Sequence, residues 1–305
     1  MTIDLNTRNV IQYLLLPLSA FFYLLSLIRR ELYRIGLFTT HQFSVPVIVV
    51  GNITVGGTGK TPIVIALVAH FKQQGKKVGV VSRGYGGKLK HSASQLVDES
   101  SKADEVGDEP MLIYQQTKVA VMVNKNRAQA VQDLITQHKI SVVISDDGLQ
   151  HYGMGRAIEI CVENGFGNGF LLPAGALREP KKRLKSVDFV IQSTLKPIAF
   201  IHLKTQQKQP LDYFQGQTCH AVAGIGKPNK FFSSLTDLGI HLIQHPFKDH
   251  HSFVVHDLNF KEIHPILMTA KDCVKCTPFI DENMWVLQVE AQLDEDFLQQ
   301  LDAKL

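Results

Sequence analysis

Residues 51–62, GNITVGGTGKTP, follow the apolar run 45–50 (VPVIVV) and precede a segment with helical apolar spacing. This order predicts a buried strand, a glycine-rich turn and a helix, the build of a loop that holds a nucleotide triphosphate. Glycine is needed there because backbone N–H groups must approach phosphate oxygens without side chains between them. The stretch therefore predicts an α/β fold of the P-loop NTPase type, with a mostly parallel sheet flanked by helices.

The residues of this loop have distinct expected roles. Lys60 is expected to reach the β- and γ-phosphates of ATP, and Thr61 to place its hydroxyl on Mg²⁺ at the start of the helix. The match to the standard loop pattern is imperfect, because Thr54 stands where that pattern has its first glycine. A glycine-rich turn that binds nothing is the alternative. The expected nucleotide-binding residues are Thr54, Gly56, Gly57, Thr58, Gly59, Lys60 and Thr61.

The composition of the chain limits the number of domains, the class of partner and the state of the cysteines. The chain has 305 residues, of which 45% are hydrophobic, enough for one large or two modest domains with a sizeable core. The formal net charge is only +4, so no nucleic-acid partner is expected. The four cysteines are too few and too scattered for a disulfide framework. Two reduced thiols account for the close pair Cys273 and Cys276 better than a zinc site, which needs further ligands.

An uncharged apolar segment, residues 10–28, lies near the N-terminus and is followed by Arg29, Arg30 and Arg34. Its length is at the short end of what crosses a bilayer. No small-residue cleavage site precedes the arginines, which disfavours a cleaved signal peptide. A membrane span, a buried core helix, and a helix lying in the inner leaflet with arginines on anionic head groups remain open. Membrane association of some kind is the favoured interpretation.

A second strong signal is the run 140–151, ISVVISDDGLQH, in which an apolar strand ends in two acids. Downstream of a phosphate-binding loop, such a strand end usually presents the carboxylate that serves Mg²⁺. Asp146 is expected to hold the metal, usually through water, since Mg²⁺ keeps several waters. Asp147, Gln150 and His151 follow on a tight turn and are expected to face the same crevice.

Two glycine-containing loops are expected near the same crevice. SRGYGG, residues 82–87, follows a short buried strand, and the carboxyl ends of strands border the ligand crevice of open α/β sheets. Arg83 is expected to contact phosphate and Tyr85 to pack on a sugar, with a flexible turn and a solvated arginine as the alternative. In VGDEP, residues 106–110, the acids either cap a helix or present the Asp108 carboxylate at the mouth of the site.

Residues 171–180, LLPAGALREP, connect two further expected strands and precede a basic run at 181–183. Arg178 and Glu179 stand among apolar residues and prolines, which indicates a deliberately placed pair. The basic run is open to two interpretations, a solvated face or an anchor for anionic lipid.

The chain is expected to divide into three parts. These are a membrane-associating helix at 1–34, a nucleotide-binding α/β domain at 35–205, and a smaller C-terminal α/β domain at 206–305 that closes over the site. The polar stretch 204–209 is the expected linker. In the smaller domain His250 follows an aspartate, where a surface histidine and a site histidine are both consistent with the sequence.

Taken together, the motifs resemble those of one family. GNITVGGTGKTP, SRGYGG, VGDEP, DDGLQH, LLPAGALREP, KDHHSF and TAKDCVK occur in this order behind an apolar N-terminal segment. The set is similar to that of the tetraacyldisaccharide 4′-kinases, the lipid A 4′-kinases of Gram-negative bacteria, over essentially the whole chain. The combination is far more specific than the phosphate-binding loop alone.

The resemblance implies an activity and a place. The implied reaction is the ATP- and Mg²⁺-dependent phosphorylation of the 4′-hydroxyl of a tetraacylated glucosamine disaccharide 1-phosphate, which gives lipid IVA in lipid A biosynthesis. The implied place is the cytoplasmic face of the bacterial inner membrane, among inner-membrane lipids. This agrees with the independent interpretation of the apolar N-terminal segment.

The resemblance also implies roles for single residues. Lys60 serves the transferred phosphate, Asp108 is the base that takes the hydroxyl proton, and His250 assists it, with His251 as the alternative partner. The resemblance implies that Asp147, Gln150, His151, Arg178 and Glu179 line the substrate site. Ser82, Arg83 and Tyr85 are expected to join them because their loop follows a strand end at the same crevice.

Two other functions remain consistent with the residues alone. A membrane-associated P-loop ATPase switch would hydrolyse ATP without a lipid acceptor and would need no base at Asp108. A P-loop kinase for a soluble metabolite would leave the apolar N-terminal segment unexplained.

Overall fold

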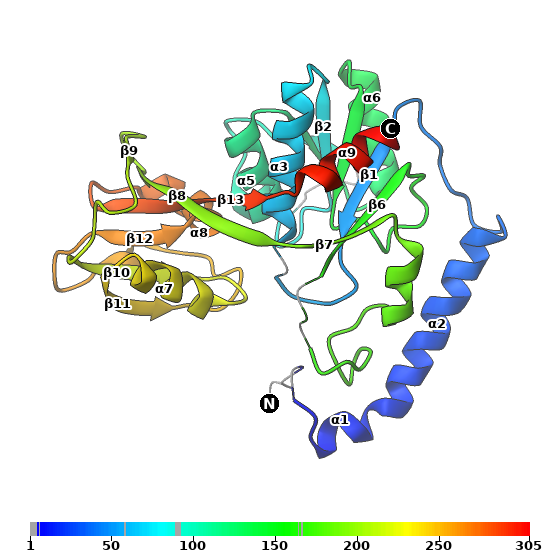
Figure 1. Cartoon of the computed structure of the whole chain (residues 1–305), viewed down its shortest axis with the longest axis horizontal. Helices are drawn as coiled ribbons and strands as arrows, with labels where there is room; N and C mark the ends of the chain where they lie inside the picture. The colour runs from blue at the N-terminus through cyan, green and yellow to red at the C-terminus, as the bar shows by residue number, and fades with distance from the viewer. Residues whose placement is uncertain (1–4, 6, 58, 89–92, 164, 166) are drawn as a thin grey trace. The chain divides into compact units, whose positions relative to one another are not determined.

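The computed structural model describes residues 5, 7–57, 59–88, 93–163, 165 and 167–305, and the chain forms two compact units (Figure 1). Unit 1 contains Met1–Arg83, Asn124–Ser193 and Leu293–Leu305, and unit 2 contains Gly84–Val123 and Thr194–Gln292. This division differs from the boundary expected at residue 205. The segment that carries Asp108 belongs to unit 2, and the last helix of the chain belongs to unit 1.

Unit 1 is built on parallel strands in the order β2-β5-β1-β6-β7. Strands β1, β2 and β5 are buried along their whole length, which is typical of parallel strands covered by helices on both faces. The expected parallel sheet flanked by helices is thus confirmed. The strands are β1 (Val47–Gly51), β2 (Val78–Ser82), β5 (Val142–Asp146), β6 (Ile158–Glu163) and β7 (Phe189–Gln192).

Helix α3 (Lys60–Gln73) follows the glycine-rich loop and contacts β1, β2 and β5, and Figure 1 shows it beside β2. It buries Ile63, Leu67 and Phe71, which recur every fourth residue and so lie on one helix face. Each such side chain contributes about 1.5–3 kcal/mol to the free energy of folding. The other helices of unit 1 are α1 (Val10–Leu14), α2 (Leu16–Arg34), α6 (Arg127–Gln137), the 3₁₀ helix η1 (Lys181–Ser186) and α9 (Glu295–Ala303).

Unit 2 contains a six-stranded sheet in the order β11-β10-β12-β13-β8-β9, together with the antiparallel pair of β3 and β4. The pairs β10/β11, β10/β12 and β12/β13 are parallel, whereas β13/β8 and β8/β9 are antiparallel. The strands are β3 (Gln95–Leu96), β4 (Ala120–Val123), β8 (Thr194–His202), β9 (Lys208–Gln209), β10 (Thr218–Ala223), β11 (His241–Pro246), β12 (Ile266–Thr269) and β13 (Met284–Gln292).

Side chains of this sheet alternate between two cores. Ala221 and Leu267 pair across β10 and β12 in one core, with helix α7 (Pro228–Asp237) packed on it (Figure 1). Their neighbours Val222 and Met268 face the other core, on the opposite side of the sheet. The remaining helices of unit 2 are α4 (Ala103–Val106), α5 (Asp108–Thr117), η2 (Val255–Leu258), α8 (Ala270–Cys276) and η3 (Thr277–Phe279).

Candidate active site

The first half of the glycine-rich loop is held by backbone pairing within unit 1. The Val55 N–H donates to the Ala176 carbonyl at 2.8 Å, and Thr54 forms an antiparallel bridge with Leu177. The Asn52 side-chain amide donates to the Thr54 hydroxyl at 3.2 Å. Thr54, which replaces the first glycine of the standard pattern, is therefore paired with the LLPAGALREP segment.

The second half of the loop uses glycine where the backbone requires it. Gly59 has a φ of 77°, and a Cβ there would collide with the side chain of Ser193, whose hydroxyl donates to the Gly59 carbonyl at 3.2 Å. Gly56 also has a left-handed φ, of 101°. A Cβ on Gly57 would meet open space. Thr58 lies outside the described residues.

Lys60 and Thr61 form the first turn of α3, and Asp146 is the last residue of β5. Parallel pairing sets Val50 of β1 opposite Asp146, so the strand that enters the loop and the strand that ends in the acid finish side by side. Among the described residues, no cluster of three or more His, Cys, Asp or Glu forms a metal site. Thr61 and Asp146 instead offer a hydroxyl and a carboxylate, hard oxygen donors of the kind Mg²⁺ combines with phosphates and waters.

Three cationic side chains of unit 1 surround Asp147. Its Oδ1 lies 3.4 Å from Lys60 Nζ, and its Oδ2 accepts from Arg178 Nη1 at 3.1 Å. Its backbone carbonyl accepts from Arg127 Nη1 at 2.6 Å. Burial raises the pKa of the Asp147 carboxyl, but Lys60, Arg178 and Arg127 outweigh it and hold the pKa below its ordinary value. The Lys60–Asp147 pair thus joins the phosphate-loop helix to the DDGLQH turn.

Gln150 and Glu179 extend this network. Gln150 Nε2 donates to the Asn52 carbonyl at 2.9 Å and to Glu179 Oε2 at 3.3 Å, while Arg178 donates to Gln150 Oε1 at 3.4 Å. The Tyr152 hydroxyl donates to Glu179, and burial together with the Glu179 charge raises the pKa of Tyr152 to about 12. Four expected substrate residues therefore lie in one network: Asp147, Gln150, Arg178 and Glu179.

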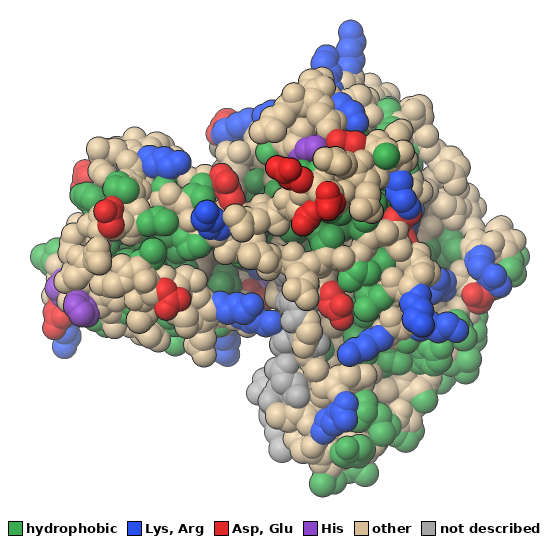
Figure 2. Space-filling view, viewed as in Figure 1, with side chains coloured by type: hydrophobic (Ala, Val, Ile, Leu, Met, Phe, Trp, Pro, Cys, Tyr) green, Lys and Arg blue, Asp and Glu red, His purple; other side chains and the backbone are tan. Residues whose placement is uncertain are grey.

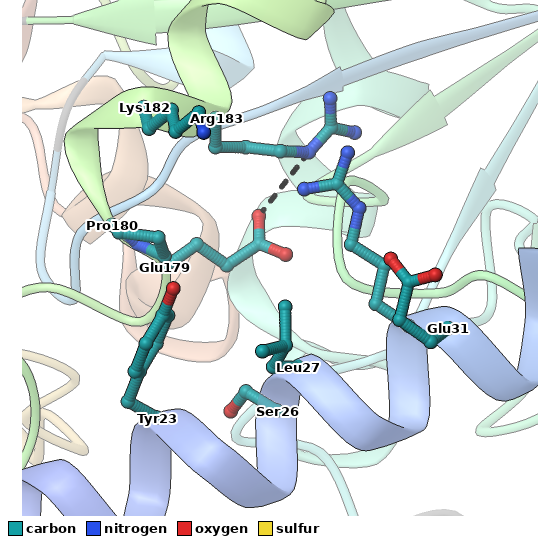
Figure 3. Close-up of a pocket in the computed structure, with 9 residues that line it drawn as sticks. Tyr23, Ser26, Leu27, Glu31, Glu179, Pro180, Lys182 and Arg183 are labelled. Carbon is teal, nitrogen blue, oxygen red and sulfur yellow. Dashed lines mark ion pairs between the residues drawn. The ribbon is translucent and has the colours of Figure 1, made fainter.

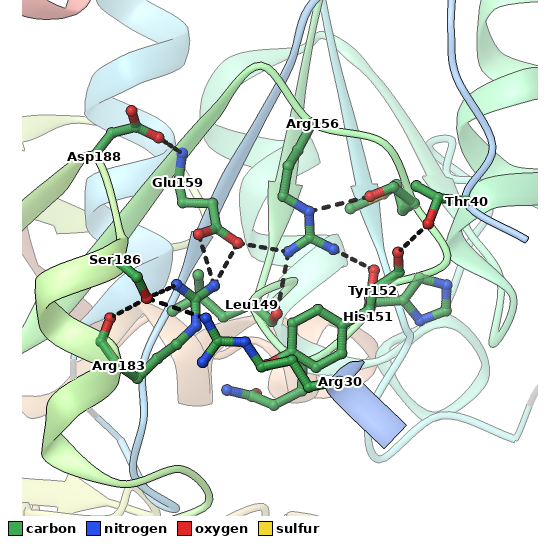
Figure 4. Close-up of polar contacts among 12 residues, drawn as sticks. Arg30, Thr40, Leu149, His151, Tyr152, Arg156, Glu159, Arg183, Ser186 and Asp188 are labelled. Carbon is green, nitrogen blue, oxygen red and sulfur yellow. Dashed lines mark hydrogen bonds and ion pairs between the residues drawn. The ribbon is translucent and has the colours of Figure 1, made fainter. Parts of the chain in front are cut away.

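A second network fixes the backbone of the same turn (Figure 4). Arg156 donates to the carbonyls of Leu149, at 3.1 Å, and His151, and its Nη1 pairs with Glu159 Oε1 at 2.9 Å. Arg183 Nη2 donates to both carboxylate oxygens of Glu159 at 2.6 Å. The turn is thereby tied to strand β6 and to η1, which limits how far its side chains can shift.

His151 is half-buried at the end of the turn. Burial, and then the charges of Arg127 and Arg156, lower the pKa of His151 to about 4. The imidazole is therefore neutral near pH 7, where it can both donate and accept a hydrogen bond.

A pocket of about 230 Å³ lies between α2 and the start of η1 in unit 1 (Figure 3). Tyr23 and Leu27 of α2 line one side, and Glu179 and Arg183, paired at 3.7 Å, line the other. Figure 3 shows the Tyr23 hydroxyl and the Glu179 carboxylate both directed toward this space. Because Glu179 also belongs to the Asp147 network, the pocket adjoins the polar site. Arg183 is buried, so neither interpretation of the basic run 181–183 describes it.

In unit 2, Asp108 begins α5 and meets His250. Asp108 Oδ2 lies 3.1 Å from His250 Nδ1, and the hydrogen bond raises the pKa of His250 against the opposing effects of burial and of Lys271. His251 instead pairs with Asp257 at 2.9 Å. Between the two histidines considered from the sequence, the structure brings His250 to Asp108.

The loop before Asp108 fits closely against the SRGYGG loop. Gly107 has a φ of 99°, and a Cβ there would lie 2.8 Å from the Tyr85 carbonyl oxygen, so glycine is required. The Tyr85 ring, 64% exposed, meets the His250 imidazole edge-on with ring centroids 5.3 Å apart. In unit 1, Ser82 is buried at the end of β2 and Arg83 is exposed.

Some polar residues of these clusters were not among the expected site residues. Arg127 is buried beneath the DDGLQH turn, and Lys271, Asp272 and Lys275 of α8 pack near Asp108. The signal for α8 was present in TAKDCVK, because Lys271 and Lys275 are four residues apart and share a helix face. Arg127 gave no comparable signal, since an arginine after a strand is ordinarily solvated.

The N-terminal helices present an apolar stripe. Leu14, Leu18, Phe21, Leu25 and Ile28 recur at helical spacing of three and four residues and are all exposed. Figure 2 shows hydrophobic side chains gathered over α2, with Lys and Arg side chains beside them. In the part of the chain that the structure describes, no helix has the length and apolarity to cross a bilayer.

Comparisons with known proteins agree with this geometry. The family model described as "Tetraacyldisaccharide-1-P 4′-kinase" matches residues 11–305. A tetraacyldisaccharide 4′-kinase of Ruthia magnifica is 56% identical, covering 99% of this chain and 100% of the relative, and one of Hahella chejuensis is 44% identical, covering 96% and 93%. A crystal structure titled as the "apo" form of LpxK from Aquifex aeolicus in complex with ATP superposes with a TM-score of 0.84 at 28% identity, covering 97% of this chain and 99% of that one.

Proposed function

Because this chain belongs to the tetraacyldisaccharide-1-P 4′-kinase family, we propose that it transfers the terminal phosphoryl group of ATP to the 4′-hydroxyl of a tetraacylated glucosamine disaccharide 1-phosphate. The product is lipid IVA, an intermediate of lipid A biosynthesis. The observation that carries this proposal is the Lys60–Asp147 ion pair at 3.4 Å, which brings the phosphate-loop lysine to the acidic turn of the neighbouring strand.

Unit 1 supplies the nucleotide side of the reaction. The loop amides and the start of α3 offer donors and a partial positive charge to the triphosphate, and Lys60 exchanges Asp147 for the β- and γ-phosphates. Thr61 and Asp146 are the residues that would hold Mg²⁺. When bound, Mg²⁺ supplies positive charge to the phosphate oxygens. Arg178 and Arg127 add further charge at the same turn, which favours the trianionic group in the transition state.

Unit 2 supplies the base. Asp108 takes the proton of the sugar 4′-hydroxyl as the oxygen attacks the γ-phosphorus, and the bond from that phosphorus to the ADP oxygen breaks with its electron pair leaving on ADP. His250 holds one carboxylate oxygen of Asp108 by its 3.1 Å hydrogen bond. The other oxygen is then the one directed to the hydroxyl.

The sugar and its substituents occupy the polar network and the pocket beside it. Gln150, Arg178 and Glu179 offer hydrogen bonds suited to hydroxyl and amide groups, and neutral His151 can serve as donor or acceptor. Arg30 and Lys182 line the pocket and suit an anionic substituent. Ser82, Arg83 and Tyr85 remain proposals as substrate contacts.

The exposed stripe of α1 and α2 supports a location of the enzyme at the membrane surface. An apolar helix face next to Arg29 and Arg30 is suited to lie in the head-group region of an anionic leaflet, which for this substrate is the cytoplasmic face of the inner membrane. Each leucine that enters the acyl boundary contributes about 1.5–3 kcal/mol to binding. The lipid acceptor is thereby reached without leaving the bilayer surface.

The direct test is incubation of the protein with ATP, Mg²⁺ and detergent-dispersed tetraacyldisaccharide 1-phosphate, with mass spectrometry of the lipid. We expect a mass gain of one phosphate that depends on Lys60 and is lost in Lys60→Met. Release of inorganic phosphate without modification of the lipid would favour the ATPase alternative. Phosphorylation of a soluble sugar in preference to the lipid would favour the soluble-metabolite kinase.

A further inference from the structure

Helix α8 carries two lysines on one face, and both meet the cluster around Asp108. Lys275 Nζ lies 2.8 Å from Asp272 Oδ1 and 3.8 Å from Asp108 Oδ2, and its side chain is 7% exposed. Lys271 Nζ lies 3.3 Å from His250 Nε2. Lys271 lies in the first turn of α8, where the helix dipole destabilises a positive charge. A residue placed against this local preference is a candidate for a functional role.

Lys271 is kept charged by its surroundings. Its Nζ lies 3.2 Å from Glu109 Oε1 on α5 and 3.4 Å from Asp249 Oδ1 on the loop before His250. Burial would lower the pKa of Lys271, but the carboxylates of Glu109 and Asp249 outweigh it and raise the pKa above its ordinary value. The group that faces His250 Nε2 is therefore an ammonium.

An ammonium donates hydrogen bonds and accepts none. At 3.3 Å from Lys271 Nζ, His250 Nε2 must therefore be the acceptor, which leaves the imidazole proton on Nδ1. Nδ1–H then donates to Asp108 Oδ2 at 3.1 Å. A doubly protonated His250 would instead set an N–H against the ammonium, a contact of like charges.

We propose that Lys271 is a positioning residue for the reaction, fixing His250 as the neutral tautomer whose Nδ1–H holds Asp108. This proposal rests on the proposed function only through the role of Asp108 as base. A neutral partner leaves the Asp108 carboxylate more basic than an imidazolium would, and it fixes which oxygen is turned to the substrate hydroxyl. The other charged groups around the pair are Glu109, Asp249, Lys275 and Asp272, with the Tyr85 ring against the imidazole edge.

The sign of the effect on pH dependence follows from these charges. The hydrogen bond to Asp108 raises the pKa of His250, as do the charges of Glu109 and of Asp249, whose Oδ1 lies 3.9 Å from Nε2. Burial and the Lys271 ammonium oppose that rise. Removing the ammonium therefore lets His250 take up its second proton at higher pH. The acidic limb of the pH profile of kcat/KM moves toward neutrality, because the imidazolium then weakens the base.

The test compares Lys271→Met with Lys271→Arg, which keeps the charge, and with Lys261→Met, which removes an exposed lysine of unit 2. The pH profile of kcat/KM for lipid phosphorylation is measured for each, together with the ¹⁵N resonances of His250 in protein labelled at histidine. We expect Lys271→Met to move the acidic limb up by about one pH unit or more, a roughly tenfold loss at the lower pH that is recovered at higher pH. Lys271→Arg and Lys261→Met should show the same pH profile of kcat/KM as the wild type.

The imidazole resonances of the wild type report the tautomer of His250 directly, without any measurement of activity and without any variant. In the wild type at pH 8 we expect an unprotonated Nε2 and a protonated Nδ1. A protonated Nε2 there, or a limb and resonances that do not move in a folded Lys271→Met, would overturn the assignment. Failure of the wild type to phosphorylate the lipid would instead refute the proposed function while leaving the tautomer measurement readable.

Discussion

Replacement of Asp108 by asparagine separates the base from every other feature of its cluster. In the wild type His250 Nδ1 lies 3.1 Å from the Asp108 carboxylate. The asparagine amide has nearly the same volume, and its oxygen can still accept a hydrogen bond from His250 Nδ1–H. Lys275 keeps its pair with Asp272 at 2.8 Å, so no cation is left stranded. The structural cost of Asp108→Asn should therefore be only about 1–2 kcal/mol in the free energy of unfolding.

The loss of chemistry should be much larger. General base catalysis typically contributes a factor of about 10²–10⁴, and each factor of ten is about 1.4 kcal/mol of activation free energy. We therefore expect kcat to fall by that factor, or about 3–5 kcal/mol, with the dissociation constant of ATP unchanged within about twofold. The proposed nucleotide site lies in unit 1, whereas Asp108 belongs to unit 2.

The assay is single-turnover phosphorylation of the detergent-dispersed lipid, with ATP affinity measured separately by calorimetry on a non-hydrolysable analogue. The matched control is Asp257→Asn, because Asp257 forms a similar pair with His251 at 2.9 Å outside the proposed site. A kcat for Asp108→Asn within threefold of the wild type, in a folded protein, would remove Asp108 from the mechanism. An equal loss in both variants would mean that Asp–His pairs of unit 2 act through folding alone.

Further substitutions test other parts of the molecule. Asp147→Asn removes one negative charge from among three cations, so urea denaturation should show about 1–3 kcal/mol less stability. Pyrophosphate should restore it, and no restoration would contradict the phosphate role. The pKa of His151 is about 4 in the folded chain, below its ordinary value, so the unfolded chain binds more protons and stability should fall by about 2–3 kcal/mol from pH 7 to pH 4, a slope that His151→Gln should flatten. Gly107→Ala should lower both the melting temperature and kcat because of its φ of 99° and its close carbonyl neighbour, whereas Gly216→Ala, with a φ of 73° in open space, should cost only about 1 kcal/mol and no activity. Leu25→Asp should lower the affinity for anionic vesicles, measured by co-sedimentation, at least about tenfold while leaving kcat on detergent-dispersed lipid unchanged. An unaltered affinity would exclude the exposed stripe as the membrane contact.

The parts of the site that the sequence predicted are those encoded within a few consecutive residues. A strand followed by a turn of special backbone shape and a helix is a local pattern, so Lys60, Thr61 and Gly59 could be placed without knowing the rest of the chain. Asp146 and Asp147 could be placed because two acids that end a buried strand are too costly to desolvate for packing alone.

The parts that could not be predicted depend on which distant segments meet. Arg156, Glu159 and Arg183 are ordinary charged residues in the sequence, and only the hydrogen bonds of Glu159 on β6 to Arg156 and to Arg183 on η1 join them in one network. The division into units was likewise hidden, because the chain passes from one unit to the other at 83/84 and returns at 123/124 without a linker-like composition. The boundary expected at residue 205 lies near only one of the four crossings, the one at 193/194, and the polarity of the chain marks none of the other three.

In the proposed mechanism the two units carry different halves of the chemistry, and the charges around their site residues differ accordingly. In unit 1 the side chains of Lys60, Arg178 and Arg127 converge on the turn that carries Asp147, which gathers positive charge at the proposed triphosphate site. In unit 2 the Asp108 carboxylate lies 3.8 Å from Lys275 Nζ, and Lys275 pairs at 2.8 Å with Asp272, so this cation beside the proposed base already has a carboxylate partner. A base on the same turn as Lys60 would form an ion pair with that lysine. The pair would weaken both proton abstraction by the base and phosphate binding by the lysine. Keeping the acceptor of the proton and the binder of the phosphate on separate clusters lets each keep the charge that its step requires.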